Sequence, residues 1–261
     1  MNGDVIRESL LSKAGRGLRR RYKTMQLRLA RKMGWPTVTS SYGPRFMANY
    51  QDATFWFYIK ASYGFFYWKR ISAISDDFIF LDIGANQGLY SICAGLNDHC
   101  QRAYAFEPVP KVAELLRQNL ALNGVEGKVE VVEMAVSDTS GTAEIVTSPA
   151  HSGVASIAQG NLVGADTLRE TIQTIDAAGL EGIVAASLLP IYVKIDVEGH
   201  EEAVIKELLK CRFAGQIREM FYEVDTRWVD PELLQSLLQT AGFHTAKIGR
   251  RKHYDVLATR I

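Results

Sequence analysis

The chain has 261 residues, of which 47% are hydrophobic and 23% are charged, a composition typical of a globular protein. Collagen-like, disordered and disulfide-scaffold proteins are therefore excluded. The three cysteines form no C-x-x-C pair, which favours a reducing compartment over a zinc site or a disulfide framework. We expect a cytoplasmic chain, because no stretch reaches the roughly 18 uncharged apolar residues of a membrane-spanning helix and the N-terminal segment lacks a signal-peptide pattern.

The net charge of +1 hides an uneven distribution along the chain. Residues 1–35 contain ten Lys or Arg side chains against Asp4 and Glu8, a net charge of +8, whereas the remaining 226 residues carry 20 basic and 27 acidic side chains. We therefore treat residues 1–35 as a separate basic segment.

This basic segment carries one apolar stripe with helical spacing. Its members recur at intervals of three or four residues; they are Ile6, Leu10, Ala14, Leu18, Tyr22, Met25, Leu29 and Met33. Gly34 and Pro36 end the predicted helix. Three roles stay open for it: peripheral contact with an anionic membrane, at the inner membrane face; binding of nucleic acid; or packing on the acidic body of its own chain.

Residues 55–68, FWFYIKASYGFFYW, hold nine of the 26 aromatic residues and one charge, Lys60. The stretch is too short to span a bilayer. It suits an interfacial belt, a wall of a substrate pocket, or a buried helix over the edge of a sheet. We assign residues 36–77 to an aromatic-rich helical cover.

From Phe78 onward, short β-branched runs alternate with longer helically spaced runs, which predicts a parallel sheet built from βαβ units. The expected strands cover residues 78–83, 102–106, 129–134, 191–196 and 217–224. The expected helices cover residues 87–96, 110–123, 199–210 and 231–240. The runs HTAKIG and YDVLATRI suit an antiparallel hairpin that closes the sheet. Residues 137–190 form an insertion, with two expected strands and a helix that opens at Asp176.

The string FIFLDIGANQGLYSI predicts a buried strand that reaches Asp82, followed by a glycine loop and a helix. Gly84 and Gly88 let the backbone turn sharply and approach a ligand. A dinucleotide site prefers G-x-G-x-x-G, whose second glycine admits a diphosphate, but Asn86 stands there in this sequence. A carboxylate at Asp82 suits a cationic amino group and repels phosphate. The loop therefore favours an amino acid-bearing nucleoside such as S-adenosylmethionine over NAD.

The next predicted strand ends in Glu107, 25 residues after Asp82. A carboxylate at this place accepts hydrogen bonds from both ribose hydroxyls of a nucleoside cofactor. The glycine loop and this acid, in this order, predict a nucleoside site at the head of the first two strands.

Four segments, DIGANQGLYS, FEPVPKVAELLRQNLALNG, EMAVSDTSGTAEI and IYVKIDVEGHE, together resemble the FkbM-type family of S-adenosylmethionine-dependent methyltransferases. The resemblance covers about residues 78–225 and leaves out the basic N-terminus. It implies that residues 78–261 form an α/β, Rossmann-like seven-stranded methyltransferase sheet of order 3-2-1-4-5-7-6 with helices on both faces. To this domain we add a helical N-terminal extension. The resemblance further implies methyl transfer to a hydroxyl, often on a sugar or polyketide.

The resemblance also implies roles for individual residues. The methionine side of the cofactor would be lined by Asp82, Gly84, Asn86 and Gly88. Glu107 would bind the ribose, and Asp138, after the third strand, would approach the adenine.

Acid–base chemistry is expected at KIDVEGHEE, where a strand passes into a helix. An alcohol proton is very weakly acidic, so its removal needs a base or a metal. We expect Asp196 to face the site, Glu198 or His200 to act as the base, and Glu223 to lie on the same rim. The alternative is that Glu198 or Glu201 merely caps the helix. We predict no metal site.

Two further motifs bear on the acceptor. His200 and Glu201 begin an H-E-x-x-H zinc motif, but Val204 stands where its second histidine would be. A D-P-P-Y or N-P-P-Y loop, typical of nucleobase methyltransferases, is absent after the fourth strand, which favours an oxygen acceptor. His151 and Ser152 can reach the acceptor from the insertion, although a loop histidine is more often solvated.

We therefore predict an S-adenosylmethionine-dependent O-methyltransferase that acts on a hydroxyl of a glycan or related small metabolite. The main alternative is a nucleic acid-associated methyltransferase or binding module that uses the basic N-terminal arm. A non-catalytic relative and an NAD-dependent oxidoreductase are further alternatives.

Overall fold

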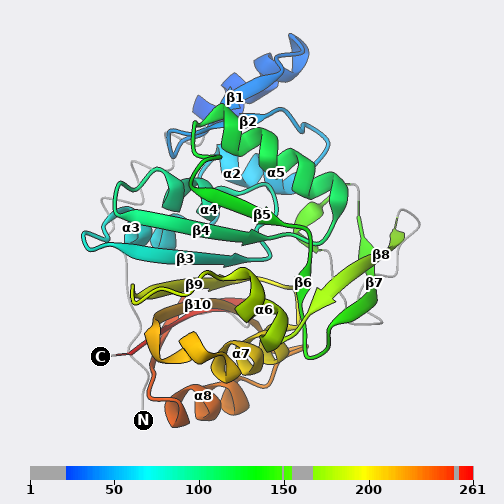
Figure 1. Ribbon diagram of the computed structural model, residues 1–261. Helices are drawn as coiled ribbons and strands as arrows, with labels where there is room; N and C mark the ends of the chain where they lie inside the picture. Colours follow the sequence, from blue (N-terminus) through cyan, green and yellow to red (C-terminus); the bar gives the residue numbers. More distant parts are fainter. Residues whose placement is uncertain (1–21, 149, 155–166, 250–252, 261) are drawn as a thin grey trace.

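The computed structural model describes residues 22–148, 150–154, 167–249 and 253–260. The main strands are β3 (Phe78–Ile83), β4 (Cys100–Phe106), β5 (Val129–Val132), β9 (Ile191–Ile195), β10 (Ile217–Asp225), β11 (His244–Ile248) and β12 (His253–Thr259). In this part of the chain they form a seven-stranded sheet of order β11-β12-β10-β9-β3-β4-β5 (Figure 1). Among these strands, β12 runs antiparallel to both of its neighbours, β10 and β11, and the other neighbouring pairs are parallel. Counted from the opposite edge, this is the predicted order 3-2-1-4-5-7-6, so the predicted fold is confirmed.

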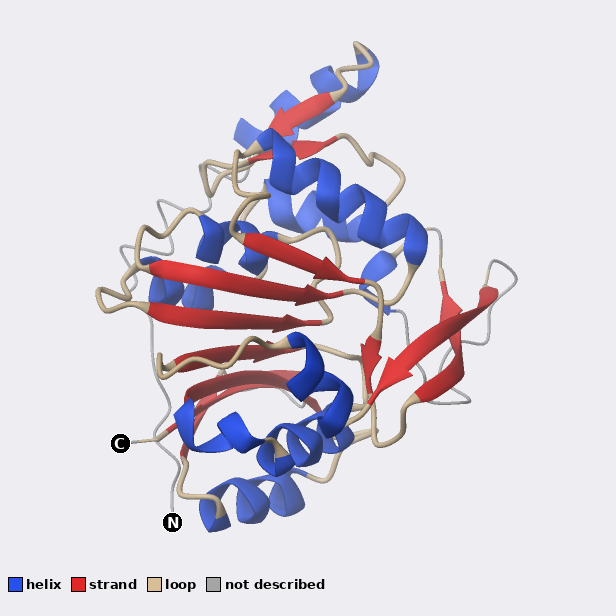
Figure 2. Ribbon diagram, viewed as in Figure 1, coloured by secondary structure: helices blue, strands red, loops and turns tan. Residues whose placement is uncertain are grey.

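Helices lie on both faces of the sheet, as expected (Figure 2). They include α4 (Leu89–Gly95), α5 (Pro110–Leu122), α6 (Ala177–Ile183), α7 (Glu201–Lys210) and α8 (Pro231–Thr240). Both α4 and α7 begin two residues later than predicted, because Gly88 and Gly199 just before them adopt positive φ angles of 92° and 102°. Within the described residues, no helix is long and apolar enough to cross a lipid bilayer.

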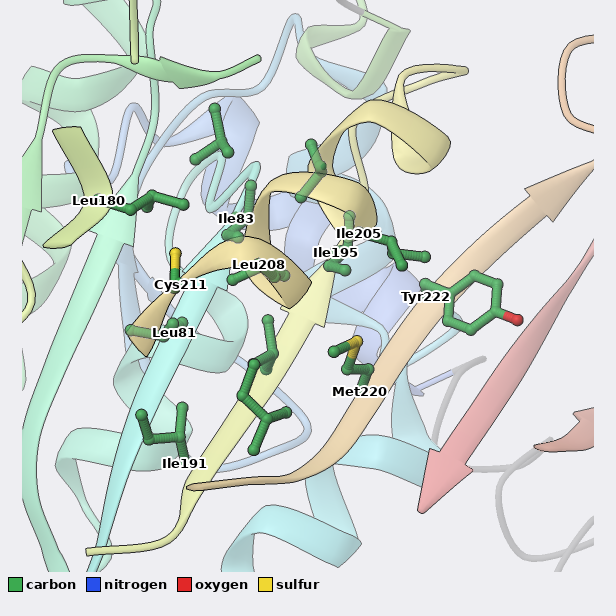
Figure 3. Close-up of a cluster of buried hydrophobic side chains, with 14 of the residues drawn as sticks. Leu81, Ile83, Leu180, Ile191, Ile195, Ile205, Leu208, Cys211, Met220 and Tyr222 are labelled. Carbon is green, nitrogen blue, oxygen red and sulfur yellow. The ribbon is translucent and has the colours of Figure 1, made fainter. Parts of the chain in front are cut away.

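Strand β3 is buried along its whole length and contributes side chains to both hydrophobic layers. Leu81 and Ile83 point into a layer shared with Leu208 of α7 (Figure 3). Phe78 and Phe80 pack into the opposite layer, which also contains residues of α3 (Phe65–Ser72), α4 and α5. Because both faces of the strand are covered, its end near Ile83 is held rigidly where the glycine loop begins.

The segment at residues 36–77, expected as an aromatic-rich helical cover, contains two short strands besides its helices. Strands β1 (Thr37–Thr39) and β2 (Arg45–Met47) pair as an antiparallel hairpin before α2 (Ala53–Ile59) and α3 (Phe65–Ser72). Three-residue strands leave little periodicity to detect in a sequence.

The aromatic stretch serves two of the three roles that the sequence left open. Tyr67 stacks on Phe221 of β10, with ring centroids 4.2 Å apart, so part of the stretch covers the sheet. Phe57, Tyr58 and Tyr63 instead line a cavity at the ends of the strands.

The insertion forms a small sheet of its own beside the main one (Figure 1). Strands β6 (Ala135–Val136), β7 (Gly141–Thr147) and β8 (Leu168–Ile175) lie in the order β6-β8-β7. The predicted helix start at Asp176 is confirmed, because this side chain caps α6 by accepting a hydrogen bond from the Gly179 backbone N–H at 3.1 Å.

Candidate active site

The glycine loop brings the ends of β3 and β9 into direct contact. Gly84 has a φ of 75°, and a Cβ added to it would lie 1.9 Å from the Asp196 carbonyl oxygen. Only glycine fits a backbone conformation and a contact of this kind. The loop is therefore built so that the strand carrying Asp196 passes closely beside Gly84.

Asp82 forms a buried ion pair rather than a wall of the cavity. Its Oδ2 accepts a hydrogen bond from Ser91 Oγ at 2.5 Å, and its Oδ1 lies 3.4 Å from Lys194 Nζ. The pairing arises because Asp82 and Lys194 stand opposite each other in the β3–β9 register. Lys194 Nζ also donates to the Gly84 carbonyl at 2.5 Å. Asp82 thus acts on the loop through Lys194.

Gly88 likewise has a packing role. It precedes α4, and a Cβ at this position would lie 2.4 Å from Leu116 Cδ1 of α5. The absence of a side chain therefore lets α4 and α5 approach each other.

Asn86 and Glu107 are joined at the head of β3 and β4. The Asn86 backbone N–H donates to Glu107 Oε2 at 2.9 Å, and the Val109 N–H donates to Glu107 Oε1 at 3.1 Å. Glu107 is 6% exposed, and burial raises its pKa to about 7. The carboxyl group is held by backbone donors while it faces the cavity.

A cavity of about 380 Å³ lies outside the carboxyl ends of the parallel strands, where ligands bind in open α/β sheets. Among the predicted site residues it is lined by Gly84, Asn86, Glu107, Asp196, Glu198, His200 and Glu223. Within the described part of the chain, the lining does not include three other predicted residues, Asp82, Gly88 and Asp138. Asp82 and Gly88 instead have the ion-pair and packing contacts described above, and Asp138 is exposed. Their roles at the cofactor stay predictions.

Three carboxyl groups meet at one end of the cavity. Ligand oxygens of Asp196, Glu198 and Glu223 all lie within 4.8 Å of one another. Burial, reinforced by the negative charge of Asp196, raises the pKa of both Glu198 and Glu223. Burial and Asp196 likewise raise the pKa of Asp255 to about 7. This end of the cavity can hold protons at neutral pH that ordinary carboxylates would have lost.

Asp196 is fixed by two partners from different elements. Tyr63 donates its hydroxyl hydrogen to Asp196 Oδ2 at 2.6 Å, and Lys194 Nζ lies 3.8 Å from the same oxygen. Glu223 is paired with His253 on β12. The cavity therefore combines aromatic hydroxyl, carboxyl and basic groups at its acceptor end.

Glu198 occupies a strained position. Its φ of 52° lies in the left-handed region, which residues other than glycine rarely adopt. The capping role belongs to Glu201, whose carboxylate accepts hydrogen bonds from the Val197 and Gly199 backbone N–H groups. Glu198 itself lines the cavity.

His200 lies beside the insertion. Its Nε2 is 3.0 Å from Ser137 Oγ, and the Ser137 hydroxyl also lies 3.2 Å from Asp138 Oδ1. Burial lowers the pKa of His200 and Asp138 partly opposes this shift, so the ring is neutral at neutral pH.

A hydrogen-bond network ties the three walls of the cavity together. Gln87 Nε2 donates to Asp52 Oδ2 at 2.8 Å, and Asp52 also caps α2 by accepting from the Thr54 N–H. Ser152 of the insertion donates to Asn86 Oδ1 at 2.9 Å. The cover, the glycine loop and the insertion are thus held in one arrangement.

Several residues of this site were missed by the sequence analysis. They are Tyr58, Tyr63, His253 and Asp255. Their roles depend on contacts between distant segments, and the aromatic density of residues 55–68 was the one available signal.

The fold and the site define a Rossmann-like methyltransferase. A family profile described as the methyltransferase FkbM domain matches residues 82–245. The chain belongs to the FkbM methyltransferase family, and S-adenosylmethionine is its cofactor. No curated protein matches the sequence.

Three solved structures illustrate the similarity of fold. TrmK from M. capricolum, in complex with S-adenosyl-homocysteine, has a TM-score of 0.44 and 15% identity. The match covers 74% of this chain and 66% of the TrmK chain, which is just under two thirds of the length of TrmK. Precorrin-6y C5,15-methyltransferase from Geobacter metallireducens has a TM-score of 0.42 and 14% identity, over 75% and 86% of the two chains. Ribosomal protein L11 methylase from Lactobacillus delbrueckii has a TM-score of 0.42 and 11% identity, over 74% and 78%.

The residues of the cavity fit the cofactor of this family. Glu107 is a buried acceptor at the end of the second strand, where ribose hydroxyls need one. Gly84 and Asn86 offer backbone and amide groups beside it, and Asp196 of the carboxyl cluster supplies negative charge for a cation.

Proposed function

We propose that this protein is an S-adenosylmethionine-dependent O-methyltransferase that modifies a hydroxyl of a glycan or related metabolite. The observation that carries the proposal is the carboxyl cluster of Asp196, Glu198 and Glu223 in the same cavity as Glu107 and the glycine loop. A hydroxyl acceptor needs a proton acceptor beside the methyl donor, and this arrangement provides one.

Cofactor binding is assigned to the head of β3 and β4. Glu107 would accept hydrogen bonds from the ribose hydroxyls, and Gly84 with Asn86 would lie along the amino acid side. Asp82 and Lys194 would support them indirectly, because Lys194 holds the Gly84 carbonyl. When bound, S-adenosylmethionine supplies a methyl group already activated by its sulfonium.

The protein then has to align the acceptor oxygen and remove its proton. We assign alignment to Asp196, because Tyr63 and Lys194 fix its position. We assign proton removal to Glu198, whose raised pKa makes its carboxylate more basic than an ordinary one. Glu223, which is paired with His253, completes the carboxyl cluster beside Asp196 and Glu198. His200, held at Ser137, remains the second candidate base.

The acceptor end of the cavity suits a polyhydroxylated ligand. Phe57 and Tyr58 line the cavity with aromatic rings, and Asp225 and Arg227 line it with charged groups. Sugar rings bind well to this combination, because one face packs on aromatic rings and the hydroxyls bind charged groups.

The test is methyl transfer from labelled S-adenosylmethionine to a panel of sugars, glycolipids and RNA. We expect an O-methylated sugar product with the native protein and at least a hundredfold lower rate with Asp196→Asn. Glu202→Gln, at an exposed pair with Lys206 on α7, is the matched control and should keep the native rate. Transfer to RNA alone, or a product methylated on nitrogen, would contradict the proposal.

A further inference from the structure

The helix formed by residues 22–32 exposes the apolar stripe that the sequence defines. Met25 is 64% exposed and Leu29 is 53% exposed. The exposed apolar side chains on and just after this helix are Tyr22, Met25, Leu29, Met33 and Trp35. Their spacing of three and four residues places the helical members along one face.

The opposite face of the same helix packs on the protein. Leu27 and Ala30 are fully buried and join the hydrophobic layer around α3 and α4. Packing on the protein's own body therefore uses this second face. The helix lies at one end of the molecule, beside β1 (Figure 1), and the side chains of its stripe are exposed.

Basic side chains lie beside the exposed stripe. Arg28, Arg31 and Lys32 are exposed, and residues 22–35 contain no acidic residue. The sequence of residues 1–21, outside the described part of the chain, adds six basic residues against two acidic ones. An apolar stripe with Lys and Arg around it matches the surface of an anionic bilayer in both respects, since the stripe enters the acyl boundary and the cations meet lipid phosphates.

We propose that this face binds the surface of an anionic lipid bilayer. A nucleic acid would satisfy the basic residues but would leave Met25, Leu29 and Trp35 without an apolar partner. A second copy of the chain would cover the stripe but would bring Arg28 and Lys32 close to the same cations of its partner. The bilayer satisfies both the apolar and the charged groups.

The test is flotation of the full-length protein with vesicles of phosphatidylcholine alone or mixed with phosphatidylglycerol. We expect binding only to the anionic vesicles, weakened by high salt. The double variant Met25→Asp, Leu29→Asp should lose binding. Arg28→Gln and Lys32→Gln should each weaken it roughly fivefold. The matched control is Leu233→Asp, at an exposed leucine on α8, which should bind like the native protein.

Circular dichroism and thermal unfolding of each variant establish that it remains folded, as expected for exposed positions. The proposal is overturned if folded Met25→Asp, Leu29→Asp binds anionic vesicles as the native protein does. Equal binding to neutral vesicles, retention on RNA without vesicle binding, or stripe-dependent dimerisation in place of vesicle binding would also overturn it. None of these outcomes depends on the methyl acceptor, so they leave the proposed enzymatic function untouched.

Discussion

At Glu198, backbone strain, burial and neighbouring negative charge act on one carboxyl group. The residue has a φ of 52°, lines the cavity, and has a pKa raised to about 8. A strained position persists only when its surroundings enforce it, and such positions concentrate at functional sites. These features support the proposal that Glu198 removes the acceptor proton.

Below a pH of about 8, Glu198 is mostly protonated and cannot accept a proton. We predict that kcat/KM rises about tenfold per pH unit below this value and levels off above it. Glu198→Gln should lower the rate and abolish this dependence, whereas Glu202→Gln should keep the native profile. A Glu198→Gln profile with the native slope would show that another group is the base.

Under the proposed function, Tyr63 is a positioning residue, because it would act on the acceptor through Asp196. Tyr63→Phe removes the 2.6 Å hydrogen bond to Asp196, and hydrogen bonds to charged groups contribute about 1.5–3 kcal/mol. We predict at least a tenfold fall in kcat with cofactor affinity unchanged. Tyr22→Phe, at an exposed tyrosine, is the control. A parallel loss of cofactor affinity, measured by calorimetry, would indicate a structural role instead.

The glycine loop is the element whose geometry decides the site. Gly84→Ala places a Cβ against the Asp196 carbonyl at a positive φ. The backbone strain costs about 1–2 kcal/mol and the overlap adds about 1–3 kcal/mol. Gly124→Ala is the control, since Gly124 has a φ of 67° and no atom within 4 Å of an added Cβ. Urea unfolding should therefore show a clearly larger loss of stability for Gly84→Ala, and equal losses would contradict the close contact.

At the scale of elements, the sequence predicts the helices and strands that depend on local residue patterns. Their apolar runs predict strands β3 and β9, and Asp176 predicts the start of α6. The sequence does not predict the pairing of Asp82 with Lys194, because the register of strands over a hundred residues apart is a property of the whole fold. The ion pair between Asp82 and Lys194 is therefore seen only in the folded structure.

The candidate site shows the same contrast between local patterns, which the sequence predicts, and long-range contacts, which it does not. The sequence places Glu107 and Asp196 at strand ends, and both line the cavity. Tyr63 reaches Asp196 across 133 residues, a contact that no spacing rule predicts. The aromatic stretch could be recognised by its composition, but its division between sheet cover and cavity wall depends on how α2 and α3 pack.

At the scale of the whole molecule, the buried acidic groups make stability depend on pH. Burial raises the pKa of Glu107, Glu201 and Asp255 to about 7 and that of Glu198 to about 8. The folded protein then binds more protons than the unfolded chain, so the free energy of unfolding falls as pH rises through these values.

We predict a lower urea midpoint at a pH of about 8 than at about 6.5, measured without cofactor. The range is chosen because cysteines and tyrosines also titrate above it. Below it, the lowered pKa of His200 makes the free energy of unfolding rise with pH instead. The double variant Glu198→Gln, Glu223→Gln should reduce the difference between the two urea midpoints. A midpoint that stays constant or rises would contradict the protonation of the acidic cluster.

The central claim is that the head of β3 and β4 binds S-adenosylmethionine through Glu107. Calorimetry with S-adenosylhomocysteine tests it most directly. We predict saturable binding to the native protein, at least tenfold weaker binding to Glu107→Gln, and native binding to Glu114→Gln at an exposed position on α5. Absence of heat with the native protein, or equal affinity of Glu107→Gln, would contradict the claim.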